Sequence, residues 1–147
     1  MDEKGVEIEH LKFSSLAEEG SDNFVMKNAK QYQLEASGDA ALSFKKGNIS
    51  FDNLDDVGKL IDRKYGHGKS VFNEIDDGFG GKTTSVNNQN RANSILTQAR
   101  NQVASAGNTL IKWEICTELG AKGIKKLFTD NRINIEVVFE AQIKIVN

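Results

Sequence analysis

Two aspartates and a lysine, Asp52, Asp62 and Lys64, are spaced so that three charged groups can meet on one face of a sheet. Alternate residues of a strand point to the same face, so Asp62 and Lys64 project side by side if the apolar residues before them form a strand. Asp52 ends the preceding apolar alternation and can meet them across a pair of strands. Two carboxylates and an ammonium are costly to bury unless a cation or a phosphate joins them. A metal-dependent phosphodiesterase needs this set of groups.

The chemistry expected of such a set is hydrolysis of a phosphodiester. The substrate is an anion, and its cleavage builds more negative charge on the phosphate oxygens. A divalent cation held by Asp52 and Asp62 would neutralise that charge and lower the pKa of a bound water. Oxygen ligands favour Mg²⁺ or Mn²⁺, with Zn²⁺ the weaker candidate. Lys64 would orient or deprotonate the attacking water, or stabilise the transition state as a point charge.

A predicted helix over residues 87–106 carries further candidates. Gln98 and Gln102 lie one turn apart on one side of it, so both can face the site and hold a phosphate or a water. We assign Gln98 to the catalytic group and Gln102 to substrate binding. Arg91 and Arg100 of the same helix are candidates for contacts with a nucleic-acid backbone. The alternative is that this side of the helix is simply solvated.

The hydrophobic spacing predicts an α/β domain in which a mixed sheet is flanked by helices. Strands that alternate with helices late in the chain need crossover connections, which implies some parallel pairing. A central hairpin over 48–65 would carry the charged set, with a polar loop near 53–58. The predicted helices cover 23–36, 87–106 and 120–130, and the other strands cover 40–44, 109–116 and 133–139, with 142–146 as an extension of the last.

Other segments carry weaker patterns. Residues 1–22 are expected to be an extension that is weakly structured or forms an edge strand, and 23–147 to be the folded domain. Ser21 or Asp22 would cap the first helix, whose candidate core residues are Phe24, Val25, Ala29, Tyr32 and Leu34. The glycine-rich stretch 66–88 is predicted as a long loop. Its run 78–84 lacks the spacing of a phosphate-binding loop.

The bulk composition limits the classes of protein. A chain of 147 residues with 38% hydrophobic residues and a net charge of −2 reads as one globular domain, so any nucleic-acid site must be a local patch. The single cysteine, Cys116, excludes an intrachain disulfide and is expected to be a small buried hydrophobe. Trp113 is expected in the core. No apolar run reaches the length of a membrane span, and residues 1–5 lack a signal-peptide pattern.

A series of short motifs along the chain carries a resemblance to a known family. The motifs are residues 30–33 before 37–38, then 51–52, 60–64, 98–102, 111–114 and 124–128. In this order the chain resembles the nucleases of the restriction-endonuclease-like fold, which share a PD-(D/E)xK motif and an αβββαβ core. More narrowly, it is similar to the toxin domains of that fold at the C-termini of bacterial polymorphic and contact-dependent toxins. The resemblance covers roughly residues 28–140.

The resemblance implies a metal-dependent endonuclease that cuts nucleic acid, with DNA favoured over RNA. It implies Asp52 and Asp62 as metal ligands, Gln33 as a substrate-binding residue, and a further ligand on the first helix, for which Gln31, Gln33 and Glu35 compete. It also implies delivery by secretion within a larger interbacterial toxin, action in the cytoplasm of the target cell, and a cognate immunity protein.

Two other functions stay open at this stage. One is a catalytically inactive nucleic-acid- or protein-binding module of the same fold. The weaker one is a neutralising protein that binds a basic partner through acidic side chains.

Overall fold

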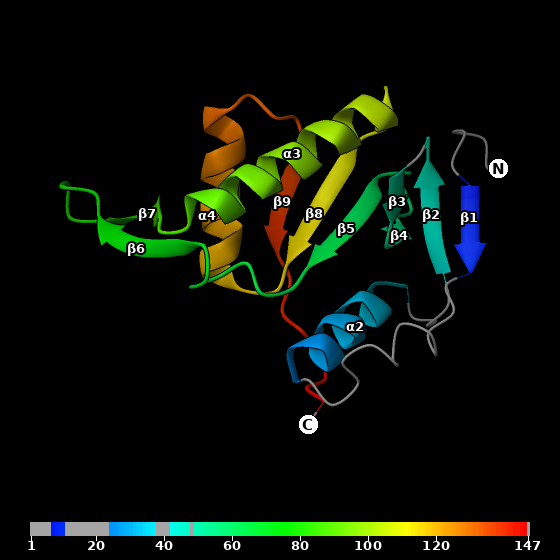
Figure 1. Ribbon diagram of the computed structural model, residues 1–147, viewed down its shortest axis with the longest axis horizontal. Coiled ribbons are helices and arrows are strands. Elements are labelled where there is room, and N and C mark those ends of the chain that lie inside the picture. Colours follow the sequence, from blue (N-terminus) through cyan, green and yellow to red (C-terminus); the bar gives the residue numbers. More distant parts are fainter. Residues whose placement is uncertain (1–6, 11–23, 38–41, 48, 147) are drawn as a thin grey trace.

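The computed structural model describes residues 7–10, 24–37, 42–47 and 49–146. Within them the chain is an α/β protein with a mixed four-strand sheet packed against helices, plus a three-strand sheet and a separate hairpin (Figure 1). This confirms the predicted fold class. In chain order the elements are β1 (Glu7–His10), α2 (Phe24–Ser37), β2 (Leu42–Lys46), β3 (Ile49–Phe51), β4 (Asn53–Leu54), β5 (Leu60–Lys64), β6 (Phe72–Asp76), β7 (Lys82–Val86), α3 (Gln89–Ala106), β8 (Ile111–Ile115), α4 (Glu118–Asp130) and β9 (Glu136–Phe139).

The four-strand sheet has the order β4-β5-β8-β9. The short β4 is antiparallel to β5, while β5 and β9 both run parallel to the central β8. Each parallel pair is joined by a helical crossover, α3 between β5 and β8 and α4 between β8 and β9, as the alternation of strands and helices predicted. The register places Asp62 directly beside Trp113.

One face of this sheet packs against α3 and α4 and forms the hydrophobic core. Leu60, Trp113 and Ile124 are fully buried there. The rings of Trp113 and Phe128 meet edge to face with their centroids 5.0 Å apart. Trp113 was predicted in the core, and the structure confirms it. The core therefore fixes β5 and β8 against α3, the helix that carries the predicted glutamines.

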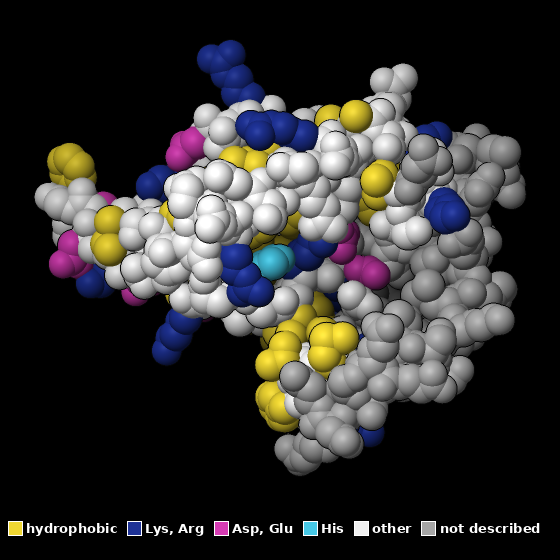
Figure 2. Space-filling model, viewed as in Figure 1, with side chains coloured by type: hydrophobic (Ala, Val, Ile, Leu, Met, Phe, Trp, Pro, Cys, Tyr) yellow, Lys and Arg dark blue, Asp and Glu magenta, His cyan; other side chains and the backbone are white. Residues whose placement is uncertain are grey.

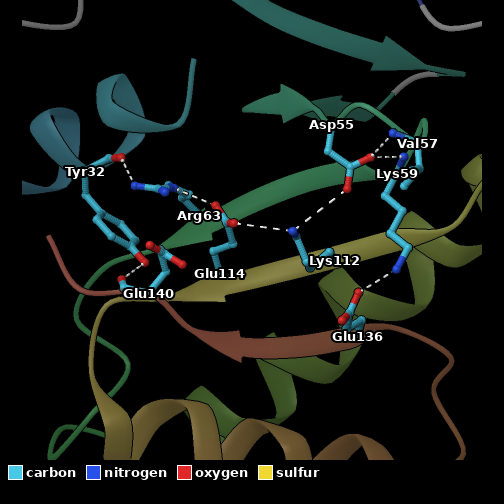
Figure 3. A network of polar contacts seen from close by, with 9 residues as sticks. All are labelled: Tyr32, Asp55, Val57, Lys59, Arg63, Lys112, Glu114, Glu136 and Glu140. Carbon is cyan, nitrogen blue, oxygen red and sulfur yellow. Dashed lines mark hydrogen bonds and ion pairs between the residues drawn. The ribbon is translucent and has the colours of Figure 1, made fainter. Parts of the chain in front are cut away.

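The opposite face of the sheet is charged and meets α2 (Figure 3). Arg63 Nε donates to Glu114 Oε1 over 2.7 Å, and Arg63 Nη1 donates to the carbonyl of Tyr32 over 3.1 Å. The guanidinium lies 4.6 Å from the centre of the Tyr32 ring. The Tyr32 hydroxyl donates to the carbonyl of Glu140, and burial raises the pKa of Tyr32 above its usual range. These contacts fasten α2 to the sheet.

The same face carries a second row of ion pairs near the N-terminal ends of β5, β8 and β9. Lys112 Nζ lies 3.6 Å from Glu114 Oε2 and 3.9 Å from Asp55 Oδ2. Lys59 Nζ lies 2.8 Å from Glu136 Oε1 (Figure 3). This face therefore uses alternating charges where the other face uses apolar side chains. Glu114, inside one of the resemblance motifs, belongs to this face and not to the face of Asp62.

Two predictions of local structure were wrong. The stretch 66–88 is not a long loop, because β6 and β7 form a hairpin whose turn is closed by the Asp77 side chain, which accepts from the amides of Phe79 and Gly81. Most of its side chains are exposed, so it lacks the apolar alternation of a half-buried strand. Residues 142–146 form no strand either. They run beside α2, where Asn28 donates to the carbonyl of Val146 and Glu35 accepts from the amide of Ile143.

The central hairpin also differs from the prediction. β3 pairs with β2, and only the two-residue β4 pairs with β5. In α2, Tyr32 is buried as predicted, but Phe24 and Val25 are 50% and 55% exposed. At the sheet edge, β1 pairs with β2. The predicted cap residues Ser21 and Asp22 lie outside the described residues.

Candidate active site

Strand β5 brings Asp62 and Lys64 to the face that α3 covers. Asp62 is 7% exposed, and Lys64 Nζ lies 2.8 Å from Asp62 Oδ2. Arg63 stands between them in sequence and points to the opposite face, where it meets Glu114. The alternation of the strand thus separates the two charged clusters, as the period of two requires. The predicted pairing of Asp62 with Lys64 is present in the structure.

Asp52 joins this pair from the short connection between β3 and β4. Its amide donates to the carbonyl of Ile61 over 2.8 Å. Its Oδ2 accepts from the amide of Arg63 over 2.7 Å, and its carboxyl is hydrogen-bonded to that of Asp62. The backbone of β5 therefore holds Asp52 in place against Asp62.

Two carboxyl groups this close cannot both ionise easily. Burial, and then the negative charge of Asp62, raise the pKa of Asp52 to about 8, although the amide of Arg63 and the ammonium of Lys64 act against that rise. At neutral pH the Asp52–Asp62 pair therefore holds one proton between its two carboxyl groups. Of the two causes of the rise, the negative charge of Asp62 is the one that a bound cation would also offset.

Helix α3 supplies two amide side chains to this cluster. Lys64 Nζ donates to Gln98 Oε1 over 2.8 Å. Gln102 is 1% exposed, and its Nε2 donates to Asp62 Oδ2 over 2.6 Å. Trp113 Nε1 donates to Gln102 Oε1 over 2.7 Å. Gln102, which we predicted to bind substrate, is thus enclosed and instead positions Asp62.

Trp113 has a role in the site that the sequence did not reveal. Lys64 Nζ lies 4.7 Å from the centre of its ring, within the range of a cation–π contact. A buried indole N–H needs an acceptor, and Gln102 is that acceptor. The signal available in the sequence was a Trp on the strand after a helix with spaced glutamines. That signal is too general to assign the contact.

His67, a loop histidine that the sequence did not assign to the site, lies close to it in the structure. Burial, followed by the positive charges of Lys64 and Arg91, lowers the pKa of His67 to about 4, with Asp62 acting against them. The imidazole is therefore neutral at pH 7. Its Nδ1 is buried and has no hydrogen-bond partner among the described residues.

The loop that carries His67 packs closely against the first turn of α4. A Cβ at Gly120 would lie 1.8 Å from the carbonyl oxygen of His67. A Cβ at Gly68 would lie 2.9 Å from Thr117 Oγ1. Real Cβ atoms do not approach other atoms so closely, so both glycines are required for this backbone contact. The position of His67 is thus set by the fold.

The remaining predicted residues are not gathered at the carboxyl pair. Arg91 is exposed in the first turn of α3, close enough to His67 to lower its pKa. Arg100 Nη2 lies 3.5 Å from Asn131 Oδ1, so it reaches the end of α4 and not the site. Gln33 lies on α2, which packs on the other face of the sheet. A direct substrate contact from Arg100 or Gln33 is therefore not supported.

Two of the three candidates for a ligand on the first helix, Gln31 and Glu35, have other partners. Glu35 accepts from the amides of Ile143 and Lys144 over 2.7 and 2.8 Å, and from Gln31 Nε2 over 2.9 Å. Burial tends to raise the pKa of Glu35, but the hydrogen bonds from Ile143, Gln31 and Lys144 outweigh it and lower that pKa. Glu35 therefore fastens the C-terminal segment to α2.

The donor set at the carboxyl pair fits a hard divalent cation. Within the described ranges, no cluster of three or more His, Cys, Asp or Glu side chains is placed to hold a metal ion. Mg²⁺ does not need one, because it keeps several waters and is bound through one or two carboxylates plus substrate phosphates. Asp52 and Asp62 provide such oxygens, and a cation bound between them would relieve their mutual repulsion.

Comparison of the chain with protein-family models, with curated proteins and with solved structures found no match. A functional assignment therefore rests on the residues described above. Of the helices that the structure describes, none combines the length and the apolar character needed to cross a membrane.

Proposed function

We propose that this chain is a metal-dependent nuclease that hydrolyses phosphodiester bonds. The observation that carries the proposal is the hydrogen-bonded Asp52–Asp62 pair with the Lys64 ammonium 2.8 Å from Asp62. Asp52 and Asp62 would hold Mg²⁺ or Mn²⁺, which would supply positive charge for the phosphate and a water of lowered pKa. The order of motifs described in the sequence supports a nuclease of the restriction-endonuclease-like fold.

The protein's own groups have distinct tasks in this proposal. Lys64 directs its ammonium at the phosphate, where it stabilises the negative charge that develops during cleavage. Gln98 accepts from Lys64 and Trp113 lies beneath it, so the ammonium is positioned before substrate arrives. Gln102 holds the Asp62 carboxylate in one orientation.

The biological setting is proposed from the motif series alone. In that setting the chain is the C-terminal effector domain of a larger interbacterial toxin, delivered by secretion, and it acts in the cytoplasm of the target cell. A cognate immunity protein would protect the producer. Induced expression in a bacterial host should then stop growth, and Lys64→Met should abolish the arrest. Equal arrest by the variant would contradict a toxin that acts through this site.

Cleavage of plasmid DNA and of total RNA, with Mg²⁺, Mn²⁺ or EDTA, tests the enzyme directly. DNA is the first choice of substrate, with RNA beside it. We expect metal-dependent cutting that Asp62→Asn and Lys64→Met each reduce by at least about 100-fold. Matched controls are Asp76→Asn and Lys59→Met, whose side chains pair elsewhere.

One outcome of this assay would transfer the assignment to another function. If folded wild-type protein cuts neither polymer with any metal, the enzyme proposal fails. Retained affinity for nucleic acid in that case would indicate a catalytically inactive binding module.

A further inference from the structure

A hollow of about 800 Å³ lies at the carboxyl ends of β5 and β8. Its lining includes Tyr65 and Gly66, which follow β5, and Cys116 and Thr117, which follow β8. Ligands of open α/β sheets bind in the crevice outside the carboxyl ends of parallel strands. The volume also falls within the range of about 300–1,000 Å³ that is usual for small-ligand sites.

Neighbouring residues and charged groups relate the hollow to the candidate active site. Tyr65 directly follows Lys64 in the chain, and Arg91 lines the hollow while acting on the pKa of His67. His67 is in turn close enough to Lys64 and Asp62 for both to affect its pKa. Figure 2 shows a histidine between Lys or Arg side chains below α3, with acidic side chains next to them and hydrophobic side chains below.

The electrostatics of the hollow favour an anion. Its lining comes from the first turn of α2, from the first turn of α3 and from Thr117, the N-cap of α4. The N-terminal end of a helix carries a partial positive charge, and amides near it favour phosphate groups. Arg91 adds a full positive charge. These features distinguish the hollow from a purely apolar groove for a protein partner.

The rest of the lining suits a flat aromatic group. Tyr65 is half-buried, and burial followed by the nearby Cys116 raises the pKa of its hydroxyl. Phe24 and Ile145 form an exposed apolar rim, being 50% and 64% exposed. Aromatic and apolar side chains around a positive edge are what single-stranded nucleic acids stack upon.

We propose that this hollow binds an unpaired nucleobase of the substrate, adjoining the phosphodiester that the carboxyl pair and Lys64 act on, so that the preferred substrate is a single-stranded segment. This inference rests on the proposed function and specifies its substrate class. Arg91 binds the neighbouring phosphate, and the Tyr65 ring stacks on the base. A duplex would have to extrude a nucleotide to fill the hollow, and would lose the pairing and stacking of that nucleotide.

The test is a binding titration in EDTA, where no metal-dependent cleavage takes place. The probes are a labelled 12-nucleotide single strand, the same strand in a duplex, and a strand of equal length whose central nucleotides lack bases. Each is made as DNA and as RNA. Wild-type protein should bind the single strand about 5- to 150-fold more tightly than the abasic strand.

The variants separate stacking from charge. Tyr65→Ala should bind the base-containing single strand no more tightly than the abasic strand. Tyr65→Phe should keep the wild-type difference in affinity between the two strands. Arg91→Ala should weaken the binding of both the base-containing and the abasic strand. Phe79→Ala, which removes a 93% exposed ring at the tip of the β6–β7 hairpin, is the matched control and should change nothing. Phe24→Ala provides a second loss of stacking if Tyr65→Ala fails to fold.

The outcomes distinguish this inference from the proposed function. Equal affinity of wild type for the base-containing and abasic strands, or for the single strand and the duplex, would overturn the inference even if the protein cuts nucleic acid. Base-dependent binding that Tyr65→Ala abolishes would support it even if no cleavage is found, and the nuclease proposal alone would then fail.

Discussion

Gln102 Nε2 donates a 2.6 Å hydrogen bond to Asp62 Oδ2 inside the protein. The orientation of the amide is fixed, because the indole N–H of Trp113 can only donate and therefore requires Gln102 Oε1. Asp62 Oδ2 also receives the ammonium of Lys64. One oxygen of Asp62 is thus committed to the protein, which leaves the other oxygen for Asp52 or a bound cation.

Replacing Gln102 with Leu should destabilise the protein and impair the site. The substitution leaves Trp113 Nε1 without an acceptor and Asp62 without one donor. Each unsatisfied buried group costs about 1–3 kcal/mol, so we expect a loss of about 2–4 kcal/mol in the free energy of unfolding. Urea denaturation measures it. Gln98→Leu, on the exposed side of α3, should stay within about 0.5 kcal/mol of wild type, and equal stability of the two variants would contradict the buried hydrogen bonds.

The Arg63–Glu114 pair should behave as a buried ion pair. Both side chains are about one-tenth exposed or less. Removing one partner leaves an uncompensated charge, so Arg63→Met or Glu114→Leu alone should cost about 3–5 kcal/mol, while the double variant should cost much less than the sum. A double-mutant cycle in urea tests this. Additive losses would show that the two side chains do not interact.

The neutral His67 should make stability depend on pH. Its folded-state pKa of about 4 lies below the unfolded value of 6.5, so the unfolded state takes up a proton more readily between these values. Stability from this group is full above pH 6.5 and is lost as pH falls towards 4. We expect a loss of about 3 kcal/mol that His67→Asn removes. Identical pH profiles for both proteins would exclude a neutral buried histidine.

Asp52 should make the stability of the protein fall as pH rises, which is opposite to the effect of His67. Its folded-state pKa is raised from 3.8 to about 8, so the folded state holds the proton more tightly than the unfolded state. The stability this gives is present below pH 3.8 and is lost as pH rises towards 8. Asp52→Asn should therefore be more stable than wild type at pH 8.5 in EDTA. A variant that is less stable there would show that the carboxylates do not repel each other.

The sequence was sufficient for the main elements because their patterns are strong. The apolar stripe of α3 and the strands around Asp62 and Trp113 follow the helical and strand periods closely. The alternation within β5 was enough to place Asp62 and Lys64 side by side, and the structure confirms that placement. Spacing along the helix likewise brought Gln98 and Gln102 to the same side.

Other features depend on tertiary contacts that a sequence does not display. Glu35 was a candidate metal ligand, but in the structure it binds the backbone of the C-terminal segment. That contact depends on where this segment runs. The position of His67 depends on two glycines, Gly68 and Gly120, that lie in separate segments. The β6–β7 hairpin buries few side chains, so its sequence resembles a loop. Whether Gln102 faces substrate or the interior was decided by the position of Trp113 on a different strand.

The central claim is that Asp52 and Asp62 together bind one divalent cation in place of their shared proton. Calorimetric titration of Mn²⁺ at pH 7, in two buffers with different ionisation enthalpies, measures both the binding and the proton release. We predict one bound ion and up to about one proton released, with binding lost in Asp62→Asn, proton release lost in Asp52→Asn, and neither changed in Asp76→Asn. Absence of binding in folded wild-type protein, or equal binding by all of these variants, would contradict the claim.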